Sequence, residues 1–315
     1  MTGYQAGDEL IELITTDDVV AEFLDSFLDR ADADRTARTP LATITVARDV
    51  LDPAAAVHGT VALAGSGQEY RVGRRSPDVP LDIGELLGVL RKLVREIWLA
   101  RTAPTGDYWY LHASAVDNGH DVVVFVGDKR HGKTTMMLDA VAGHGYRLLT
   151  NDGLLFVRSG SDLVLAPLPT LAKIRGDVVA RFLPFLSTRS LDPFNAGQLR
   201  GWCDAGRGTL FLTFGALGRK FADVPLADRQ VSVVGVRFGS PPRVTNLAPP
   251  VGTTLIERNR KDLPIVFGDL VGFVRATPDG QRQLVEDLVK QVDILEFRHA
   301  GDAGPLLESL GDTGS

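Results

Sequence analysis

The stretch "VVVFVGDKRHGKTTMMLDAV", residues 122–141, constrains the fold of this chain more than any other segment. It begins as an unbroken apolar run typical of a buried strand, continues into a charged loop bounded by glycines, and ends in a helical pattern. The loop, residues 127–134, matches G-x-x-x-x-G-K-[ST] at every fixed position. We therefore expect an α/β domain with a phosphate-binding loop between a strand and a helix. An incidental glycine turn is the alternative.

Each fixed position of this loop suits phosphate binding. Gly127 and Gly132 allow the backbone to curl so that successive N–H groups point inward. The helix that begins at Lys133 directs the positive end of its dipole to the same place, and the lysine would reach the β- and γ-phosphates. The Thr134 hydroxyl would join the shell of a Mg²⁺ ion, so the sequence predicts ATP and Mg²⁺ as cofactors. The residues expected to contact the nucleotide are Gly127, Asp128, Lys129, Arg130, His131, Gly132, Lys133, Thr134 and Thr135. Of these, Lys129, Arg130 and His131 also fit a solvated, charged rim of the loop.

Composition narrows the class of protein. The 315 residues, of which 44% are apolar and 23% charged, suffice for two domains and a sizeable core. No segment approaches the ~20 uninterrupted apolar residues of a membrane span, and the first residues lack the pattern of a secretory signal. A net charge of −6 without a basic run argues against nucleic-acid binding. We expect a soluble, cytoplasmic protein. Its single cysteine, Cys203, excludes an internal disulfide and is expected to be a small, partly buried residue rather than a reactive thiol.

Two domains are predicted, a smaller α+β domain over residues 1–104 and a larger α/β domain over residues 105–315. The turn formers of "TAPTGD", residues 102–107, mark the boundary. The first domain is expected to contain an amphipathic helix over residues 17–29, a polar linker, a group of antiparallel strands over residues 41–50, 59–65 and 68–74, and a long helix over residues 81–101. Asp82 and Glu85 are spaced as the capping box of that last helix.

In the second domain the pattern changes to strand, loop, helix and strand. A strand is expected over residues 108–116, the buried strand and helix of the glycine loop follow, and two short strands are joined through Asn151-Asp152-Gly153. The Asp-Gly pair is a hairpin signal in its own right. The chain closes with a helix over residues 280–290, a strand over 292–298 and a short helix over 303–310.

Two polar residues are expected to lie beside the glycine loop. His112 is on the strand-like run before the loop, and Asp152 ends the apolar run after its helix. If these strands are neighbours in one sheet, both residues end near the loop, where open α/β sheets keep their sites. This predicts an acid/base pair beside a γ-phosphate. The sequence has no N-K-x-D and no LSGGQ-type signature, which argues against a GTPase switch and a transporter ATPase.

Three segments in order carry a family resemblance: "LHASAV", "VVVFVGDKRHGKTT" and "GHGYRLLTND". They resemble the catalytic core of the HPr serine kinase/phosphorylase family, which is similar in topology to phosphoenolpyruvate carboxykinase. "LAKIRGDVV", residues 171–179, is similar to the E-I-R-G signature of the family, and residues 292–310 to its final strand and helix. The resemblance covers residues 108–310, most clearly to 156, and does not extend to the first hundred residues. It implies a P-loop kinase core with a smaller α+β N-terminal domain, and assembly into homo-oligomers.

The resemblance also implies roles for single residues. Lys133 and the loop amides would hold ATP, with Thr134 and Asp152 at the Mg²⁺ ion. Asp152 would accept the proton of a substrate hydroxyl as it attacks the γ-phosphate, and His112 would orient Asp152 or the attacking group. Arg175 would stabilise the charge on the transferred phosphoryl group.

Two positions depart from the pattern of the family. The family has an acidic pair where this chain has Asn151-Asp152, so Asp152 must serve as the base. The glutamate of E-I-R-G is Lys173 here, which leaves that metal-ligand position without an acid. Both differences indicate a divergent member with a substrate other than the HPr protein.

Structural roles compete with functional ones at several of these residues. Asp152 fits the turn of a hairpin, His112 a satisfied, partly buried histidine, and Arg175 an ordinary surface residue. The run "ERNRKD", residues 257–262, fits a solvated charged surface better than a phosphate-facing loop.

The first functional hypothesis is an ATP-dependent kinase that phosphorylates a hydroxyl of a small molecule or peptide. The second is a nucleotide-binding regulatory or scaffold protein with a degenerate kinase site, and the third is an ATPase coupled to a partner. Asn151 and Lys173 favour a degenerate site, whereas the intact loop and Asp152 favour activity.

Overall fold

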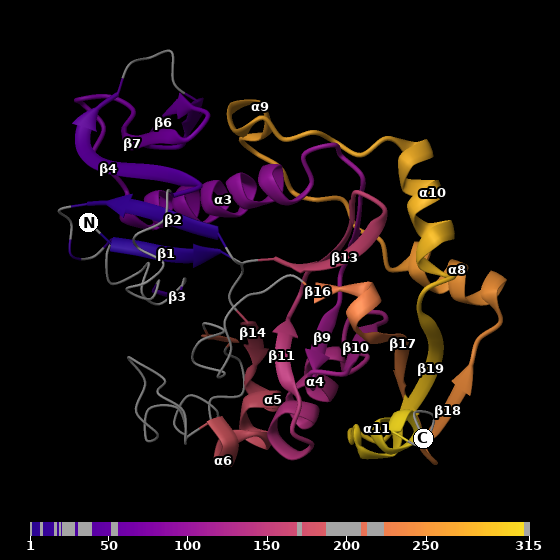
Figure 1. The fold of residues 1–315 in the computed structure, drawn as a ribbon. Helices are drawn as coiled ribbons and strands as arrows, with labels where there is room; N and C mark the ends of the chain where they lie inside the picture. The colour runs from indigo at the N-terminus through magenta and orange to yellow at the C-terminus, as the bar shows by residue number, and fades with distance from the viewer. Residues whose placement is uncertain are drawn as a thin grey trace. The chain divides into compact units, whose positions relative to one another are not determined.

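The computed structural model describes residues 2–6, 9–15, 18, 20, 29–30, 40–51, 56–168, 172–186, 209–212 and 224–311. The chain folds into two compact units of mixed α/β structure (Figure 1). The first combines Met1–Gly106 with Leu263–Arg275, and the second combines Asp107–Asp262 with Ala276–Ser315. The predicted helix over residues 17–29, the linker after it and Cys203 lie outside the described residues, apart from single positions of the helix. Among the described helices, none has both the length and the apolar character needed to span a membrane.

The first unit contains a seven-stranded sheet of order β3-β1-β2-β4-β7-β6-β5. Its strands are β1 (Thr2–Ala6), β2 (Glu9–Ile14), β3 (Asp29–Arg30), β4 (Ala42–Val50), β5 (Ala56–His58), β6 (Val61–Ser66) and β7 (Glu69–Arg74). The three predicted strands are present as β4, β6 and β7, but the prediction of an antiparallel group is wrong in part. Strands β6 and β7 are antiparallel, whereas β4 runs parallel to both β2 and β7. Alternation of apolar and polar residues is the same in both kinds of pairing, so it predicts strands without their direction.

The long helix of the first unit, α3 (Ile83–Thr102), confirms the predicted helix within two residues. Its capping box is half formed. The Asp82 carboxylate accepts from the Glu85 N–H at 2.8 Å, but the Glu85 carboxylate turns to the backbone N–H and hydroxyl of Thr60, both at 2.6 Å. Buried Glu96 accepts from the N–H groups of Val266 and Phe267, at the start of the short helix α9 (Gly268–Val271). These bonds hold Leu263–Arg275, the second chain segment of this unit, against α3.

The second unit is built on a six-stranded sheet of order β11-β9-β10-β17-β19-β18 (Figure 1). Its strands are β9 (Ser114–Asp117), β10 (Asp121–Val126), β11 (Arg147–Thr150), β17 (Gln230–Phe238), β18 (Arg243–Asn246) and β19 (Asp293–His299). Strands β10, β17 and β19 are parallel, β9 is antiparallel to both of its neighbours, and β18 is antiparallel to β19.

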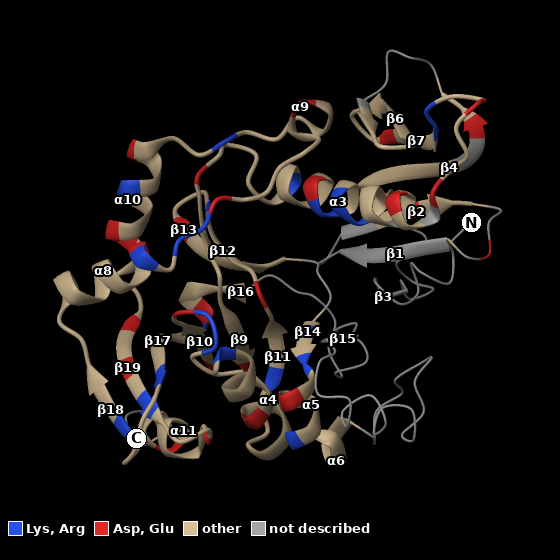
Figure 2. Cartoon of the chain, turned by 180° about the vertical axis from the view of Figure 1, so that it is seen from behind, with Lys and Arg blue, Asp and Glu red and all other residues tan. Residues whose placement is uncertain are grey.

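Both faces of this sheet are covered. Val123 and Phe125 of β10 pack in one core cluster with α4 (Lys133–Gly143) and α11 (Gly304–Gly311), while Val122 and Val124 pack in another with α8 (Pro249–Arg258) and α10 (Pro278–Leu288). A strand buried on both faces reads as a continuous apolar run, which explains why the segment before the glycine loop shows no alternation. Charged residues of both signs occur along α10 and along α3, as Figure 2 shows.

A second sheet, of order β16-β13-β12-β8, joins β8 (Tyr108–Leu111), β12 (Leu154–Ser159), β13 (Asp162–Pro167) and β16 (Val224–Pro225). A two-stranded sheet pairs β14 (Ala172–Arg175) with β15 (Thr209–Leu212), and the short helices α5 (Gly176–Arg181), α6 (Leu183–Leu186) and η2 (Leu226–Asp228) complete the described elements of this unit. The closing helix, strand and helix predicted from the sequence are confirmed as α10, β19 and α11, with bounds shifted by one or two residues.

Two predictions about strands are corrected at the junction of these sheets. The expected strand over residues 108–116 breaks at His112-Ala113, because β8 belongs to the four-stranded sheet and β9 to the six-stranded one. The expected hairpin through Asn151-Asp152-Gly153 is wrong, because β11 pairs with β9 whereas β12 pairs with β8 and β13. The chain therefore crosses twice between the same two sheets, and both crossings meet at the carboxyl end of β10.

Candidate functional site

The glycine loop, residues 127–134, connects the carboxyl end of β10 to the first turn of α4. Gly127 has φ of 142° and Gly132 has φ of 93°, so both take backbone conformations that favour glycine. A Cβ at Gly127 would lie 2.8 Å from the Val236 carbonyl oxygen, and one at Gly132 would lie 2.5 Å from a carbon of the His299 ring. Any side chain at either position would displace the loop from the sheet.

Lys133 is folded back across this loop. Its ammonium group donates to the carbonyl oxygens of Gly127 at 2.8 Å and Asp128 at 3.2 Å, and only 8% of the residue is exposed. Burial lowers the pKa of Lys133, and the nearby Asp152 carboxylate opposes that shift. The lysine charge is thus held at the N-terminus of α4, next to the carboxylate predicted as the base.

His112 and Asp152 meet where the two sheet crossings meet. The His112 Nδ1 lies 3.3 Å from the Asp152 carboxylate and 3.2 Å from its carbonyl oxygen. Burial lowers the pKa of His112, although the Asp152 charge acts in the opposite direction. Asp152 has φ of 83°, a left-handed conformation that is uncommon for residues other than glycine, although Asp and Asn tolerate it better than most, and that clusters at functional sites. The structure therefore brings His112, Asp152 and Lys133 together.

Asn151, which follows β11, forms hydrogen bonds with residues of β9, α4 and β14. Its buried Oδ1 accepts from the Ser114 hydroxyl at 2.9 Å and from the Thr134 hydroxyl at 3.2 Å, while its Nδ2 donates to the Lys173 carbonyl at 3.3 Å. An aspartate could accept the first two bonds but could not donate the third. The amide at this position therefore has a structural reason, and it also holds the hydroxyl predicted to bind Mg²⁺.

Asn151→Asp is expected to lower the free energy of unfolding by about 1–3 kcal/mol, because the bond to the Lys173 carbonyl would be lost and a charged carboxylate would replace a buried amide. Urea unfolding of the variant measures the change. Asn246→Asp on β18, an exposed position, is the matched control and should change stability little. Equal stability of Asn151→Asp and the wild type would contradict the role assigned to the amide.

Sequence reasoning missed Asn259. The Gly127 N–H donates to its Oδ1 at 2.9 Å, and its Nδ2 donates to the Leu255 carbonyl at 2.8 Å. Arg258 pairs with Asp128 at 2.6 Å. The expectation of a solvated charged run holds for the exposed side chains of residues 257–262 but is wrong for buried Asn259. No spacing in the sequence signals a contact across 132 residues.

Sequence reasoning also missed His299, which lies at the end of β19 and contacts the backbone of the glycine loop. Its Nε2 lies 2.9 Å from the His131 carbonyl oxygen, and the Gly301 N–H donates to its Nδ1 at 3.1 Å. Because Nδ1 accepts, the proton of the neutral ring is on Nε2, which donates to the loop. The ring is fully buried, and burial lowers the pKa of His299.

The stability of the protein should fall as the pH drops below about 6.5. The folded-state pKa values of His112 and His299 are both lowered, so each group binds its proton more readily in the unfolded chain. Each contributes a slope of at most about 1.4 kcal/mol per pH unit. Urea unfolding between pH 7.5 and 5.5 measures it. His299→Gln, whose amide can make both hydrogen bonds, should give a shallower slope than the wild type, and an unchanged slope would contradict the assignment.

The remaining predicted residues are placed as follows. Arg175 is exposed and pairs with Asp177 at 2.7 Å; among the described contacts it has none with the glycine loop. Lys129 and Arg130 are exposed on the outer side of the loop, whereas His131 and Thr135 are partly buried.

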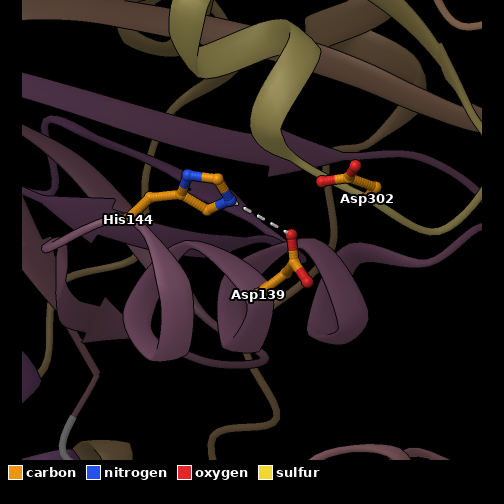
Figure 3. A group of neighbouring side chains, drawn as sticks. All are labelled: Asp139, His144 and Asp302. Carbon is orange, nitrogen blue, oxygen red and sulfur yellow. Dashed lines mark ion pairs between the residues drawn. The ribbon is translucent and has the colours of Figure 1, made fainter.

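A separate group of possible metal ligands, Asp139, His144 and Asp302, lies farther along α4 and at the start of α11 (Figure 3). Its ligand atoms lie within 4.8 Å of one another, with His144 Nε2 3.6 Å from Asp139. The Asp139 oxygens already accept from Arg181 at 3.4 Å and from the Ala303 N–H at 2.9 Å. These bonds give the Asp139 carboxylate a structural role, since it links α4 to Arg181 of α5 and to the backbone just before α11. Asp139 lies ~9 Å from Lys133 along the axis of α4.

No family model and no curated protein matches this chain, so its function rests on the site itself.

Proposed function

We propose that the protein is an ATP-dependent kinase that transfers the γ-phosphate to a hydroxyl of a small molecule or peptide. The observation that carries this proposal is the contact of His112 with Asp152 beside Lys133, at the first turn of α4. A cation and backbone amides at a helix N-terminus suit the phosphates of a nucleotide, and a carboxylate next to them suits a proton acceptor.

The residues present fit a Mg-nucleotide. The loop has the positive φ angles of a backbone cradle, and Lys133 has its charge inside it. On binding, phosphate oxygens would replace the two carbonyls that Lys133 now contacts. Thr134 and Asp152 are the residues that would hold Mg²⁺, which supplies neutralisation of the phosphate charge.

Asp152 is proposed to be the general base. The acceptor hydroxyl oxygen forms a bond to the γ-phosphorus, the bond from that phosphorus to the β,γ-bridging oxygen breaks, ADP leaves with its electron pair, and the hydroxyl proton passes to the Asp152 carboxylate. His112 positions this carboxylate through its Nδ1 contact. The partly exposed Asp152 side chain is accessible to an acceptor.

A nucleotide-binding scaffold without transfer is favoured by one observation. The Thr134 hydroxyl donates to Asn151, at a position where the kinase resemblance has an acid. A neutral amide attracts Mg²⁺ less than a carboxylate does, which would weaken catalysis more than nucleotide binding.

The test of the proposal is a screen for transfer of ³²P from γ-labelled ATP to metabolites and peptides, with Asp152→Asn as the blank. A labelled product formed by the wild type and not by the variant supports the kinase. If the wild type binds ATP and labels no acceptor in the screen, the scaffold is the better description.

A further inference from the structure

Residues 259–261 form a short ladder with the end of β8. The Lys261 N–H donates to the Tyr110 carbonyl at 3.1 Å, the His112 N–H donates to the Asn259 carbonyl at 3.3 Å, and Leu111 and Arg260 form an antiparallel bridge between them. The backbone of Lys261 is therefore fixed two residues from His112.

This register assigns each side chain to a face. Residues directly opposite each other in an antiparallel pair share a face, and successive residues alternate. Arg260 lies over the Trp109 ring at 5.3 Å, on the face of Trp109 and Leu111. Lys261 is consequently on the opposite face, with His112 and Asn259.

That opposite face is the one that carries the site. On it, the Tyr110 hydroxyl donates to the Asp152 carbonyl at 3.4 Å, His112 contacts Asp152, and Asn259 accepts from the Gly127 N–H. Lys261 thus shares a face with the proposed base and with the residue that anchors the glycine loop.

The charge of Lys261 acts on His112 and Lys133, and no acidic side chain among the described residues forms an ion pair with it. Burial is the main cause of the lowered pKa values of His112 and Lys133, and the Lys261 ammonium lowers both further. Its neighbours Arg258 and Arg260 are paired with Asp128 and Asp262, whereas no carboxylate in the described part of the chain pairs with Lys261. Two ammonium groups near one another repel, and an anion between them removes that cost.

We infer that Lys261 is a second phosphate-binding cation of this site and that it contacts the γ-phosphate of the nucleotide. This inference rests on the proposed nucleotide site and adds a residue that the glycine-loop motif does not include. The loop amides and Lys133 would bind the β-phosphate, and Lys133 also reaches the γ-phosphate, so loss of Lys261 would weaken the binding of a nucleoside triphosphate more than that of a diphosphate.

Calorimetric titration of Lys261→Ala with the Mg complexes of ADP and of a β,γ-imido ATP analogue tests the inference. The affinity for the triphosphate analogue should fall about tenfold or more, as for a lost charged hydrogen bond, while that for ADP should change less than about twofold. Lys261→Arg should restore most of the difference. Lys290→Ala, which removes an exposed lysine of the same charge from its ion pair with Asp287, is the control and should bind both nucleotides as the wild type does.

Equal losses for the two nucleotides, or no loss, would overturn the inference. The result of this titration can be distinguished from the result of the phosphoryl-transfer screen. A wild type that binds the analogue but labels no acceptor would overturn the kinase and leave the Lys261 comparison decisive. A Lys261→Ala variant that binds both nucleotides normally would overturn Lys261 while transfer by the wild type stands.

Discussion

Lys133→Ala is expected to abolish the stabilisation that Mg-ATP gives the wild-type protein. A ligand at ~100 times its Kd stabilises a folded protein by about 2.7 kcal/mol, and without the lysine the phosphates would lose the cation held inside the loop. The measurement is thermal unfolding of wild type and variant with and without Mg-ATP. The shift caused by nucleotide is the quantity to compare.

The midpoint without nucleotide is expected to change too, because Lys133 bonds to the carbonyls of Gly127 and Asp128 in the folded chain. Lys290→Ala serves again as a control for loss of a lysine and should keep the full shift. A wild type whose unfolding does not respond to Mg-ATP would contradict the proposed nucleotide site altogether.

Asp152→Asn is expected to slow phosphoryl transfer by about 10²- to 10⁴-fold, the usual contribution of a general base. Nucleotide binding should fall much less than transfer, because Lys133 and the loop amides are unchanged, although an amide is a weaker Mg²⁺ ligand than a carboxylate. Asparagine tolerates the left-handed backbone at φ of 83°, and the backbone carbonyl that meets His112 and Tyr110 is unchanged. The change therefore removes the charge of the proposed base and Mg²⁺ ligand while the backbone contacts are kept.

Two further variants keep this prediction falsifiable. Asp152→Gly removes the backbone strain together with the carboxylate, so it should be folded and inactive. Asp279→Asn alters a carboxylate on α10 that is almost fully exposed, and it should be fully active. Transfer by Asp152→Asn at the wild-type rate would show that another group accepts the proton.

Local signals in the sequence were sufficient for the elements that bear the site. The glycine loop, α4, α10, β19 and α11 appear close to their predicted positions, because strand and helix periodicity and glycine placement act over a few residues. The capping of α3 shows the limit of such local signals. Asp82 caps its own helix as predicted, but Glu85 bonds Thr60, a partner set by the fold of the sheet.

Other parts of the site depend on contacts between distant segments. Asn151-Asp152-Gly153 has the residues of a hairpin, yet β11 and β12 pair with different partners in two different sheets. Asn259 and His299 contact the loop although they are 132 and 168 residues away from their loop partners along the chain. Neither has a spacing relation to the loop, so only their placement in the folded chain identifies them.

The sequence by itself predicted a phosphate-binding loop at residues 127–134 and determined its local form, since the curl of the loop, the start of the helix and the lysine are all local. It also determined that His112 and Asp152 are chemically suited to a site. The tertiary structure decided that these two residues meet, because two crossings between the same sheets end at the same edge. It likewise decided that Asn151 is held as an amide and that Lys261 shares a face with His112. Partners in a folded chain are chosen by packing across the whole domain, and packing has no fixed spacing along the sequence.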